Sequence, residues 1–332
     1  MTKPVRWGIL GASDFAADKM GPAIHAAKGA TLAGLATSSR DKAARFLAFA
    51  SDIEVYPDYE ALLADRSIEA VYIPLPNHLH VEWTLRAIEA GKHVLCEKPL
   101  AMRAGEFDAV IAARDRSNLL VAEAYMIAHH PQFHRARDLV QGGAIGKLHL
   151  VDAVFSYDNS ADTQNIRNRA ETGGGSLPDI GVYTFGSARL VTGEEPLRLA
   201  AHIHREKGVD VFAHVTGDFP SFRFSSVTSM RMHPRQEITF HGTTGFIRLT
   251  APWNPAVFGE AQLELHRNDH SGDAPAARTT ERWSRVNHYV LQVENFGRTL
   301  REGADYPCPL EFSRATQAMI DMAFDAEGDG DG

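Results

Sequence analysis

The chain has 332 residues, of which 44% are hydrophobic and 23% are charged, and its formal net charge is −8. This composition is typical of a globular protein of about two domains, and it excludes disordered and fibrous classes. The negative charge argues against a protein that neutralises nucleic-acid phosphates, because such domains carry a concentrated basic face. A small-molecule partner fits the charge better, and no nucleic-acid partner is expected.

Cysteine and histidine usage indicates the compartment and the metal content. Two cysteines, Cys96 and Cys308, are too few for a disulfide framework, and neither belongs to a metal-binding Cys/His pattern. A reducing, cytoplasmic location is therefore expected. The 16 histidines form no carboxylate-rich ligand pattern, so no metal site is predicted. Residues 1–10 lack the apolar core of a signal peptide, and no later stretch is long enough to span a bilayer.

Short apolar runs alternate with helical stretches over residues 1–123, which is the pattern of βαβ units in a parallel sheet covered on both faces. Strands are expected at Val5–Leu10, Thr31–Ala36, Ala70–Ile73, His93–Cys96 and Leu119–Ala122. Helices with apolar residues at helical spacing are expected at Asp41–Phe49, Leu79–Glu89 and Gly105–Arg114. The segment 1–123 is therefore predicted to be a doubly wound α/β domain that binds a dinucleotide.

After Glu123 the pattern changes, and residues 124–332 are predicted to form an α+β domain. One helix, Gln132–Val140, precedes longer runs in which polar and apolar residues alternate. Alternation is typical of an antiparallel sheet with one covered face and one open face. The alternating runs cover Leu148–Tyr157, Phe219–Met232 and Glu237–Leu249. Other expected features are a hairpin turn at Thr243-Thr244-Gly245, a helix from Pro309 and a frayed acidic tail at Gly328–Gly332.

The segment Gly8-Ile9-Leu10-Gly11-Ala12-Ser13-Asp14-Phe15-Ala16 lies where a dinucleotide-binding turn would open a helix after the first strand. Aligned on Gly11, the pattern G-x-G-x-x-G/A reads Gly11, Ser13, Ala16, so serine replaces the second glycine. Gly11, Ser13, Asp14 and Phe15 are the predicted cofactor-binding residues of this turn. The alternative is a tight strand-to-helix turn without a ligand.

The segment Thr37-Ser38-Ser39-Arg40 follows the second expected strand, where NAD enzymes usually place Asp or Glu to bind the ribose 2′-hydroxyl. No carboxylate stands here before Asp41. Ser38, Ser39 and Arg40 could instead hold a 2′-phosphate through charge-assisted hydrogen bonds. The sequence therefore favours NADP over NAD. The alternative is an N-cap serine and a solvated arginine that begin the next helix.

Three motifs together resemble the Gfo/Idh/MocA (glucose-fructose oxidoreductase / inositol dehydrogenase) family. They are Pro76-Asn77-His78-Leu79-His80, Gly91-Lys92-His93-Val94-Leu95-Cys96-Glu97-Lys98-Pro99 and Gly173-Gly174-Gly175-Ser176-Leu177-Pro178-Asp179-Ile180-Gly181-Val182-Tyr183. The resemblance covers essentially the whole chain. It implies a Rossmann domain followed by an open-faced β-sheet domain, with the active site in the cleft between them. It also implies a homo-oligomer, a dimer or tetramer, formed through the sheet.

The resemblance assigns the family's E-K-P lysine to Lys98 and its acid/base pair, in the D-x-x-x-Y form, to Asp179 and Tyr183. Oxidation of an alcohol needs a base that takes the hydroxyl proton while hydride leaves carbon. Tyr183 could be that base, because a nearby ammonium such as Lys98 lowers the pKa of a phenol from its usual value of about 10. Asp179 could orient sugar hydroxyls or the lysine. Taken singly, these residues could also be a surface lysine, a helix cap and a core aromatic.

The resemblance implies further residues that bind the cofactor and others that bind the substrate. Around the cofactor they are Leu75, Pro76, Asn77, His80, Glu97 and Lys98. Loop capping is the alternative for Asn77 and His80. Around the substrate they are Lys98, Tyr125, Arg167, Asp179, Tyr183 and Tyr289.

Asn165-Ile166-Arg167 ahead of the glycines, together with the D-x-x-x-Y pair, is most similar to the branch of NADP-linked aldose 1-dehydrogenases and dihydrodiol dehydrogenases. The expected function is hydride transfer between a nicotinamide and a sugar or sugar-like alcohol or carbonyl compound, of the aldose 1-dehydrogenase type. The alternatives are a dihydrodiol, anhydro-sugar or inositol dehydrogenase or reductase, and a non-catalytic NADP-binding regulator.

Overall fold

The computed structural model describes residues 3–268 and 277–327, so the tail expected at 328–332 lies outside the described residues. The chain forms two compact units. The first unit comprises residues 1–129 and 287–314, and the second comprises residues 130–286 and 315–332. The expected boundary after residue 123 lies near the first crossing, but the expectation did not include the return of 287–314 to the first unit.

The first unit is built on a six-stranded sheet in which every neighbouring pair is parallel. Its strands follow the order β3-β2-β1-β4-β5-β6, which confirms the predicted doubly wound Rossmann sheet. The strands are β1 (Val5–Leu10), β2 (Ala30–Ala36), β3 (Glu54–Tyr56), β4 (Ala70–Ile73), β5 (His93–Cys96) and β6 (Val121–Glu123). The short β3 was not expected, because two of its three residues are exposed and it has no apolar run.

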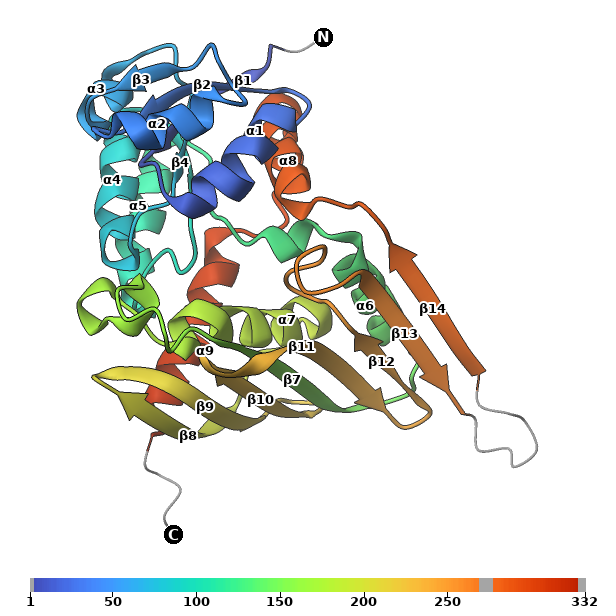
Figure 1. The fold of residues 1–332 in the computed structure, drawn as a ribbon. Helices are drawn as coiled ribbons and strands as arrows, with labels where there is room; N and C mark the ends of the chain where they lie inside the picture. Colours follow the sequence, from blue (N-terminus) through green and yellow to red (C-terminus); the bar gives the residue numbers. More distant parts are fainter. Residues whose placement is uncertain (1–2, 269–276, 328–332) are drawn as a thin grey trace. The chain divides into compact units, whose positions relative to one another are not determined.

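Helices cover both faces of this sheet (Figure 1). On one face, Ile24, Phe46 and Phe296 bring α1, α2 and α8 into the core, and on the other, Leu62 and Trp83 bring in α3 and α4. The helices are α1 (Gly21–Ala26), α2 (Arg40–Leu47), α3 (Tyr59–Ala64), α4 (His80–Glu89), α5 (Phe107–Ser117) and α8 (His288–Glu302). Shorter helical segments are η1 (Ala16–Met20), η2 (Asn77–Leu79), η3 (Ala104–Glu106) and η4 (Met126–His129).

Helix α8 belongs to the first unit although nearly 160 residues of the second unit precede it. The ring of Phe296 lies 4.8 Å from that of Trp7 in β1. The Arg301 guanidinium contacts the Glu69 carboxylate at 2.7 Å. One buried aromatic pair and one partly buried ion pair therefore attach this late segment to the first sheet.

The second unit is an eight-stranded sheet with the order β14-β13-β12-β11-β7-β10-β9-β8. Only β7 and β10 pair in parallel, so the sheet is mostly antiparallel, as predicted. The turn expected at 243–245 joins β11 to β12, whereas the run expected at Phe219–Met232 is divided between β10 and the start of β11. The strands are β7 (Leu148–Asp158), β8 (Arg198–Glu206), β9 (Val209–Asp218), β10 (Arg223–Ser229), β11 (Arg231–Gly242), β12 (Gly245–Leu249), β13 (Ala261–Arg267) and β14 (Ala277–Trp283).

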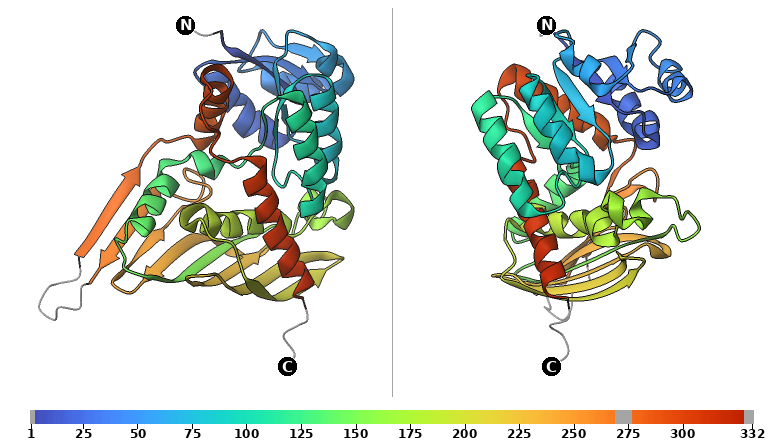
Figure 2. Two further views of the ribbon diagram at one scale, coloured as in Figure 1. Left: turned by 180° about the vertical axis from the view of Figure 1, so that it is seen from behind. Right: turned by 90° about the vertical axis from the view of Figure 1, so that its left-hand side faces the viewer.

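Helices lie over one face of this second sheet, where α7 and the second half of α9 are seen in Figures 1 and 2. On the other face a row of paired residues, Thr216, Ser225, Asp152 and Thr239, crosses four strands, and none of the four is buried. The sheet is therefore open on one side, as expected. The helical segments are α6 (Pro131–Gln141), η5 (Ile166–Asn168), η6 (Ala170–Thr172), η7 (Leu177–Gly181), α7 (Val182–Thr192) and α9 (Leu310–Asp325). None of the helices in the described part of the chain combines the length and the apolar character that a membrane span requires.

Candidate active site

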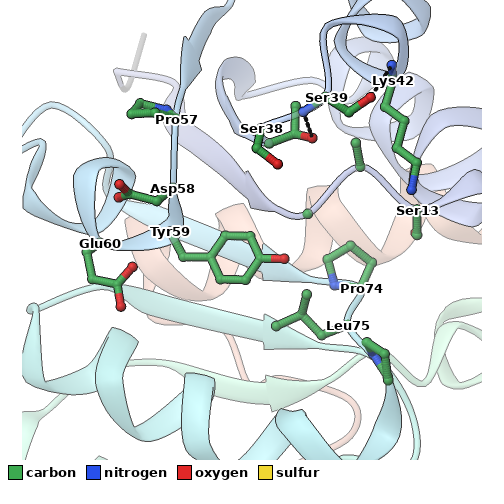
Figure 3. Close-up of a pocket in the computed structure, with 14 residues that line it drawn as sticks. Ser13, Ser38, Ser39, Lys42, Pro57, Asp58, Tyr59, Glu60, Pro74 and Leu75 are labelled. Carbon is green, nitrogen blue, oxygen red and sulfur yellow. Dashed lines mark hydrogen bonds between the residues drawn. The ribbon is translucent and has the colours of Figure 1, made fainter. Parts of the chain in front are cut away.

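A pocket of about 470 Å³ lies at the carboxyl ends of β1 and β4 in the first unit (Figure 3). These strands are neighbours, and the strand order reverses between them, which is where open α/β sheets bind ligands. Six lining residues were predicted from the sequence, namely Gly11, Ser13, Ser38, Ser39, Leu75 and Pro76. The others are Ala12, Thr37, Lys42, Pro57, Asp58, Tyr59, Glu60 and Pro74.

Gly11 keeps the floor of this pocket open. Its φ of +105° is a conformation that residues with a side chain rarely adopt. A Cβ added to Gly11 would lie 3.0 Å from the Leu75 side chain and 3.3 Å from the Tyr59 hydroxyl. The glycine therefore leaves room for a ligand to approach the backbone, and this cradle fits a dinucleotide.

Ser13, which stands in place of the second fingerprint glycine, caps the helix that follows. Its Oγ accepts a hydrogen bond from the backbone N–H of Ala16 at 3.1 Å. An N-cap hydroxyl satisfies one of the backbone donors that a helix start leaves unpaired. Where the fingerprint has a flexible glycine, this chain therefore has a serine whose hydroxyl fixes the turn through a local hydrogen bond.

The end of β2 presents hydroxyl groups and one ammonium to the pocket. Ser39 is the N-cap of α2, and its Oγ accepts from the backbone N–H of Lys42 at 3.3 Å. Figure 3 shows the Lys42 side chain extending toward Ser13. Arg40, the predicted cation, is exposed and does not line the pocket. Lys42 could have been found from the sequence, because it lies in the first turn of the helix that Ser39 caps.

The opposite wall follows β3 and was not predicted. Asp58 and Glu60 bring carboxylates to it, but Asp58 caps α3 through the Ala61 N–H at 2.7 Å, and Glu60 contacts the Arg86 guanidinium at 2.9 Å. The ring of Tyr59 extends between these walls toward Pro74 (Figure 3). Both carboxylates are therefore already engaged within the protein.

Asp14, Phe15, Asn77 and Tyr125 are among the predicted residues of the first unit that lie outside the lining of this pocket. The Asp14 carboxylate is exposed and pairs with Arg45. Phe15 packs edge-on against Tyr289 of α8, with 5.7 Å between the ring centroids. Asn77 begins η2, and Tyr125 is buried beside Phe312 at 6.0 Å.

The loop that carries Lys98 is fixed by polar side chains, of which Tyr72 and Glu123 are buried and Glu97 is partly buried. The Tyr72 hydroxyl donates to Glu97 at 2.5 Å, and Glu97 also accepts from the Lys98 backbone N–H at 3.3 Å. The Leu100 N–H donates to the Glu123 carboxylate at 2.8 Å. Lys98 itself is half-buried. These bonds hold the backbone on both sides of the lysine.

His80 connects this loop to the pocket. The ring is completely buried, and its Nδ1 lies 2.8 Å from the Pro99 carbonyl while its Nε2 lies 2.7 Å from the Leu75 carbonyl. Burial lowers the pKa of His80, and the two carbonyl contacts oppose that shift. The predicted cofactor residue therefore joins two loops from inside the protein rather than lining the pocket.

Two carboxylates with raised pKa values, those of Glu97 and Glu123, interact with the charge of Lys98. Burial raises the pKa of Glu97 and of Glu123, while the hydrogen bonds they accept and the charge of Lys98 act in the opposite direction. An ammonium near two carboxylates, one of them buried and one partly buried, favours their ionised forms. Lys98 therefore favours the ionised forms of Glu97 in this loop and of Glu123 in β6, against the effect of burial.

In the second unit, η7 and α7 carry Asp179 and Tyr183. The Asp179 carboxylate contacts the Arg167 guanidinium at 2.9 Å and accepts from the Tyr157 hydroxyl at 2.7 Å. Burial, followed by the charge of Asp179, raises the pKa of Tyr157, so this phenol remains a donor. Tyr157 was not predicted, because only the position of β7 relative to η7 reveals the pair.

Tyr183 lies four residues after Asp179, in the first turn of α7. The side chain is buried, and its ring centroid is 5.8 Å from that of Phe155. The charge of Asp179 raises the pKa of Arg167 most strongly, and Tyr157 and Tyr183 also contribute. The Arg167 guanidinium is therefore an electrostatic partner of Tyr183 as well as of Asp179.

These groups are suited to polar bond chemistry. In the second unit, a guanidinium, an oriented carboxylate and a phenol can bind hydroxyl or carbonyl oxygens and move a proton. In the first unit, the half-buried Lys98 ammonium can bind such an oxygen. Within residues 3–268 and 277–327, no three His, Cys, Asp or Glu side chains gather in a way that could hold a metal ion.

Two family models match the chain. One is described as an oxidoreductase family with an NAD-binding Rossmann fold and matches residues 5–125. The other is described as a GFO/IDH/MocA C-terminal domain and matches residues 133–248. Together they cover more than half of the chain.

Individual relatives span nearly its full length. A dTDP-3,4-didehydro-2,6-dideoxy-alpha-D-glucose 3-reductase from Saccharopolyspora spinosa is 33% identical over 332 residues, covering 97% of this chain and 96% of the relative. A D-xylose 1-dehydrogenase (NADP+) from Haloferax volcanii is 32% identical over 326 residues, covering 96% of each. A 3-ketoreductase from Actinomadura kijaniata, solved with NADP and TDP-benzene, has a TM-score of 0.87 and 27% identity over 98% of each chain.

Proposed function

Because the chain belongs to the Gfo/Idh/MocA family of NAD-binding oxidoreductases, as its motifs had indicated, we propose that it transfers hydride between NADP and a sugar or sugar-like substrate. The proposal is carried by the presence, in one chain, of a pocket for the cofactor and of a group of polar side chains suited to hydride-transfer chemistry. One is a dinucleotide pocket at the switch point of a Rossmann sheet. The other is a carboxylate held by Tyr157 and Arg167, four residues before Tyr183.

NADP is the proposed cofactor, and bound NADP supplies the carbon that accepts or donates hydride. Gly11 and Ser13 would hold the pyrophosphate, and Ser38, Ser39 and Lys42 would hold the 2′-phosphate. Support comes from the pocket wall after β2, which offers hydroxyls and an ammonium where an NAD enzyme would place a carboxylate. The ketoreductase from Actinomadura kijaniata was itself solved with NADP.

We propose that Tyr183 exchanges the proton of the reacting oxygen. During oxidation its phenolate takes the hydroxyl proton, and during reduction its phenol returns a proton to the new alkoxide. The positive charge of Arg167 supports the phenolate, and Lys98 is proposed to bind the reacting oxygen. Asp179, held by two donors, is proposed to orient substrate hydroxyls rather than to exchange the proton.

Two substrate classes are supported by full-length relatives. The first is a keto group on a nucleotide-linked deoxysugar, as in the name of the Saccharopolyspora spinosa reductase. The second is the anomeric carbon of a free aldose, which the sequence had favoured and which matches the Haloferax volcanii dehydrogenase. NADPH oxidation with a dTDP-linked keto sugar, compared with NADP+ reduction by xylose or glucose, distinguishes the two classes.

The proposal is tested by running this screen on the wild type, Lys98→Ala and Tyr183→Phe. With a substrate found, both variants are expected to lose at least a hundredfold in kcat while NADPH binding, measured by fluorescence, is retained. Near-wild-type turnover in both variants would overturn the residue assignments. Tight NADPH binding without turnover of any sugar, polyol or carbonyl compound would support the alternative of a non-catalytic regulator.

We further propose that the chain forms a homo-oligomer through the open face of the second sheet. Support comes from apolar side chains on that face, since Val227 and Phe246 are only partly buried within one copy. Sedimentation or light scattering of the wild type and of Val227→Asp tests this. A multimer that the aspartate dissociates is expected, and a monomeric wild type would overturn the proposal.

A further inference from the structure

Asp210, in β9, has a buried carboxylate. This carboxylate contacts the start of the segment that carries Asp179 and Tyr183. The residue is 1% exposed. Its Oδ2 accepts one hydrogen bond from the Ser176 hydroxyl at 2.8 Å and another from the Leu177 backbone N–H at 2.7 Å. Leu177 is the first residue of η7, so Asp210 acts on this helical start from a different strand.

The third glycine of the Gly173-Gly174-Gly175 motif makes this contact possible. Gly175 has a φ of +132°, and a Cβ there would lie 2.1 Å from Asp210 Oδ1. No other residue type fits at that distance. On the other side, Ser176 Oγ also lies 3.1 Å from Thr228 Oγ1 of β10. The glycine motif therefore lies against the Asp210 carboxylate of β9, and β10 contacts the serine that binds this carboxylate.

The segment that Asp210 holds leads directly to the proposed reactive groups. Asp179 is the third residue of η7, and its N–H bonds to the Gly175 carbonyl at 3.2 Å. Tyr183 follows in the first turn of α7 without a break in the helix. A shift at Leu177 is therefore passed along a rigid helical segment to both side chains.

We propose that Asp210, in its ionised form, is a positioning residue that fixes the start of η7 and thereby orients Asp179 and Tyr183. The inference rests on the proposed function, because it gives these two residues their roles. Asp210 acts through backbone and Ser176 contacts and needs no contact with substrate. Misplacement of a reacting group by about 1 Å lowers turnover by as much as a hundredfold.

The charge on Asp210 is sensitive to acid. Burial raises the pKa of Asp210 to about 6, although its two hydrogen bonds and the charge of Arg205 in β8 oppose the shift. Arg205 is itself paired with Glu327 at 2.6 Å. Hydrogen bonds to an ionised acceptor are roughly twice as strong as neutral ones. The grip on Ser176 and Leu177 therefore weakens as the pH falls below about 6.

The inference is tested with Asp210→Asn and Asp210→Ala in the full chain. Asparagine keeps an acceptor oxygen but cannot ionise, whereas alanine removes the acceptor. The matched control is Glu264→Gln, because Glu264 is also a buried carboxylate of the same sheet and is paired with Arg248 at 2.6 Å instead. The measurements are kcat, KM and NADPH binding from pH 5 to 8.5, and hydrogen exchange of the peptide spanning 173–183.

Alanine is expected to lower kcat at least tenfold with NADPH binding unchanged and to speed exchange of the Leu177 amide. Asparagine is expected to lower kcat less than alanine does. In the wild type and Glu264→Gln, kcat is expected to fall as the pH drops below about 6, and Asp210→Asn is expected to lack this part of the acid limb. Slow exchange at Leu177 in both Asp210 variants, or an unchanged acid limb in Asp210→Asn, would overturn the inference. The exchange readout is independent of turnover, so it separates this result from a failure of the Tyr183 assignment, which Tyr183→Phe reports.

Discussion

The Tyr157 hydroxyl donates a hydrogen bond to the Asp179 carboxylate at 2.7 Å, and the Arg167 guanidinium contacts the same Oδ2 at 2.9 Å. A carboxylate held by a phenol and a guanidinium has a fixed direction and is a weaker base than a free one. This geometry assigns Asp179 to orientation. It is the reason that the proton-exchange role is proposed for Tyr183.

Replacing Tyr157 with phenylalanine removes only the hydroxyl that directs Asp179. We expect kcat to fall about tenfold, which corresponds to roughly 1.4 kcal/mol of barrier, because Asp179 can then rotate about its contact with Arg167. Steady-state kinetics at pH 7.5 measure the effect. Tyr56→Phe is the control, since Tyr56 donates to Asp65 in the first unit. Equal losses in both variants would indicate a general effect on the fold.

Arg167→Lys keeps a positive charge but loses the planar donor geometry that contacts Asp179. A loss of about tenfold in kcat is expected, with a smaller change in the melting temperature because the Arg167 side chain is 40% exposed. Arg169→Lys is the matched control, because Arg169 pairs with the exposed Glu171 at 2.7 Å. A kcat for Arg167→Lys equal to that of the control would contradict a role for the ion pair in turnover.

The first sheet was predictable from sequence because its strands are buried on both faces. The strands β1, β4 and β5 begin and end where their apolar runs do, and burial there is nearly complete. The short β3 was not predictable, since only Tyr56 of its three residues is buried. The wall formed by Asp58, Tyr59 and Glu60 was missed with it.

The residues that the sequence could not pair are those whose partners are set by the packing of distant elements. Tyr157 is 22 positions from Asp179, and Asp210 is 33 positions from Leu177, so neither contact follows from local spacing. Lys42 is different. Once Ser39 is recognised as an N-cap, helical geometry brings the third residue of the helix back toward it, and the cation could have been assigned without a structure.

Lys42→Ala should weaken NADP binding about tenfold and leave NAD binding nearly unchanged, because the removed ammonium is proposed to pair with the 2′-phosphate. Arg40→Ala is the matched control. It removes the same charge two residues away, from a side chain that does not line the pocket. Dissociation constants for both cofactors, measured by fluorescence titration at two salt concentrations, decide the matter. An equal or larger loss of NADP affinity in Arg40→Ala would show that Arg40, as the sequence suggested, binds the 2′-phosphate.

His130 makes the stability of the second unit depend on acid. It is fully buried, and its Nδ1 accepts from the Gln132 N–H at 3.1 Å as the N-cap of α6. Burial lowers the pKa of His130 from 6.5 to about 4. The folded state therefore favours the neutral ring, so this contribution is complete above pH 6.5 and is lost as the pH falls from 6.5 to 4. It amounts to roughly 3 kcal/mol.

His130→Asn retains an N-cap acceptor that does not titrate, so its melting temperature should fall less steeply between pH 6.5 and 4 than that of the wild type. His204→Asn, which removes an exposed imidazole from the same unit, should follow the wild type. Calorimetric melts at half-unit pH intervals provide the comparison. Parallel curves for all three proteins would show that His130 does not carry the acid sensitivity.

Gly175→Ala tests why the last residue of the Gly173-Gly174-Gly175 motif is glycine. The added methyl group meets two separate obstacles, the φ of +132° and the Asp210 carboxylate 2.1 Å away. Gly208→Ala isolates the first obstacle, because Gly208 has a φ of +85° in the same unit but its nearest contact is 3.6 Å away. We expect Gly208→Ala to lower the free energy of unfolding by about 1 kcal/mol with kcat retained. Gly175→Ala should lose more stability and at least tenfold in kcat, because the carboxylate must withdraw from Leu177. Similar kcat values in the two variants would mean that the backbone conformation alone, and not the approach to Asp210, requires glycine at position 175.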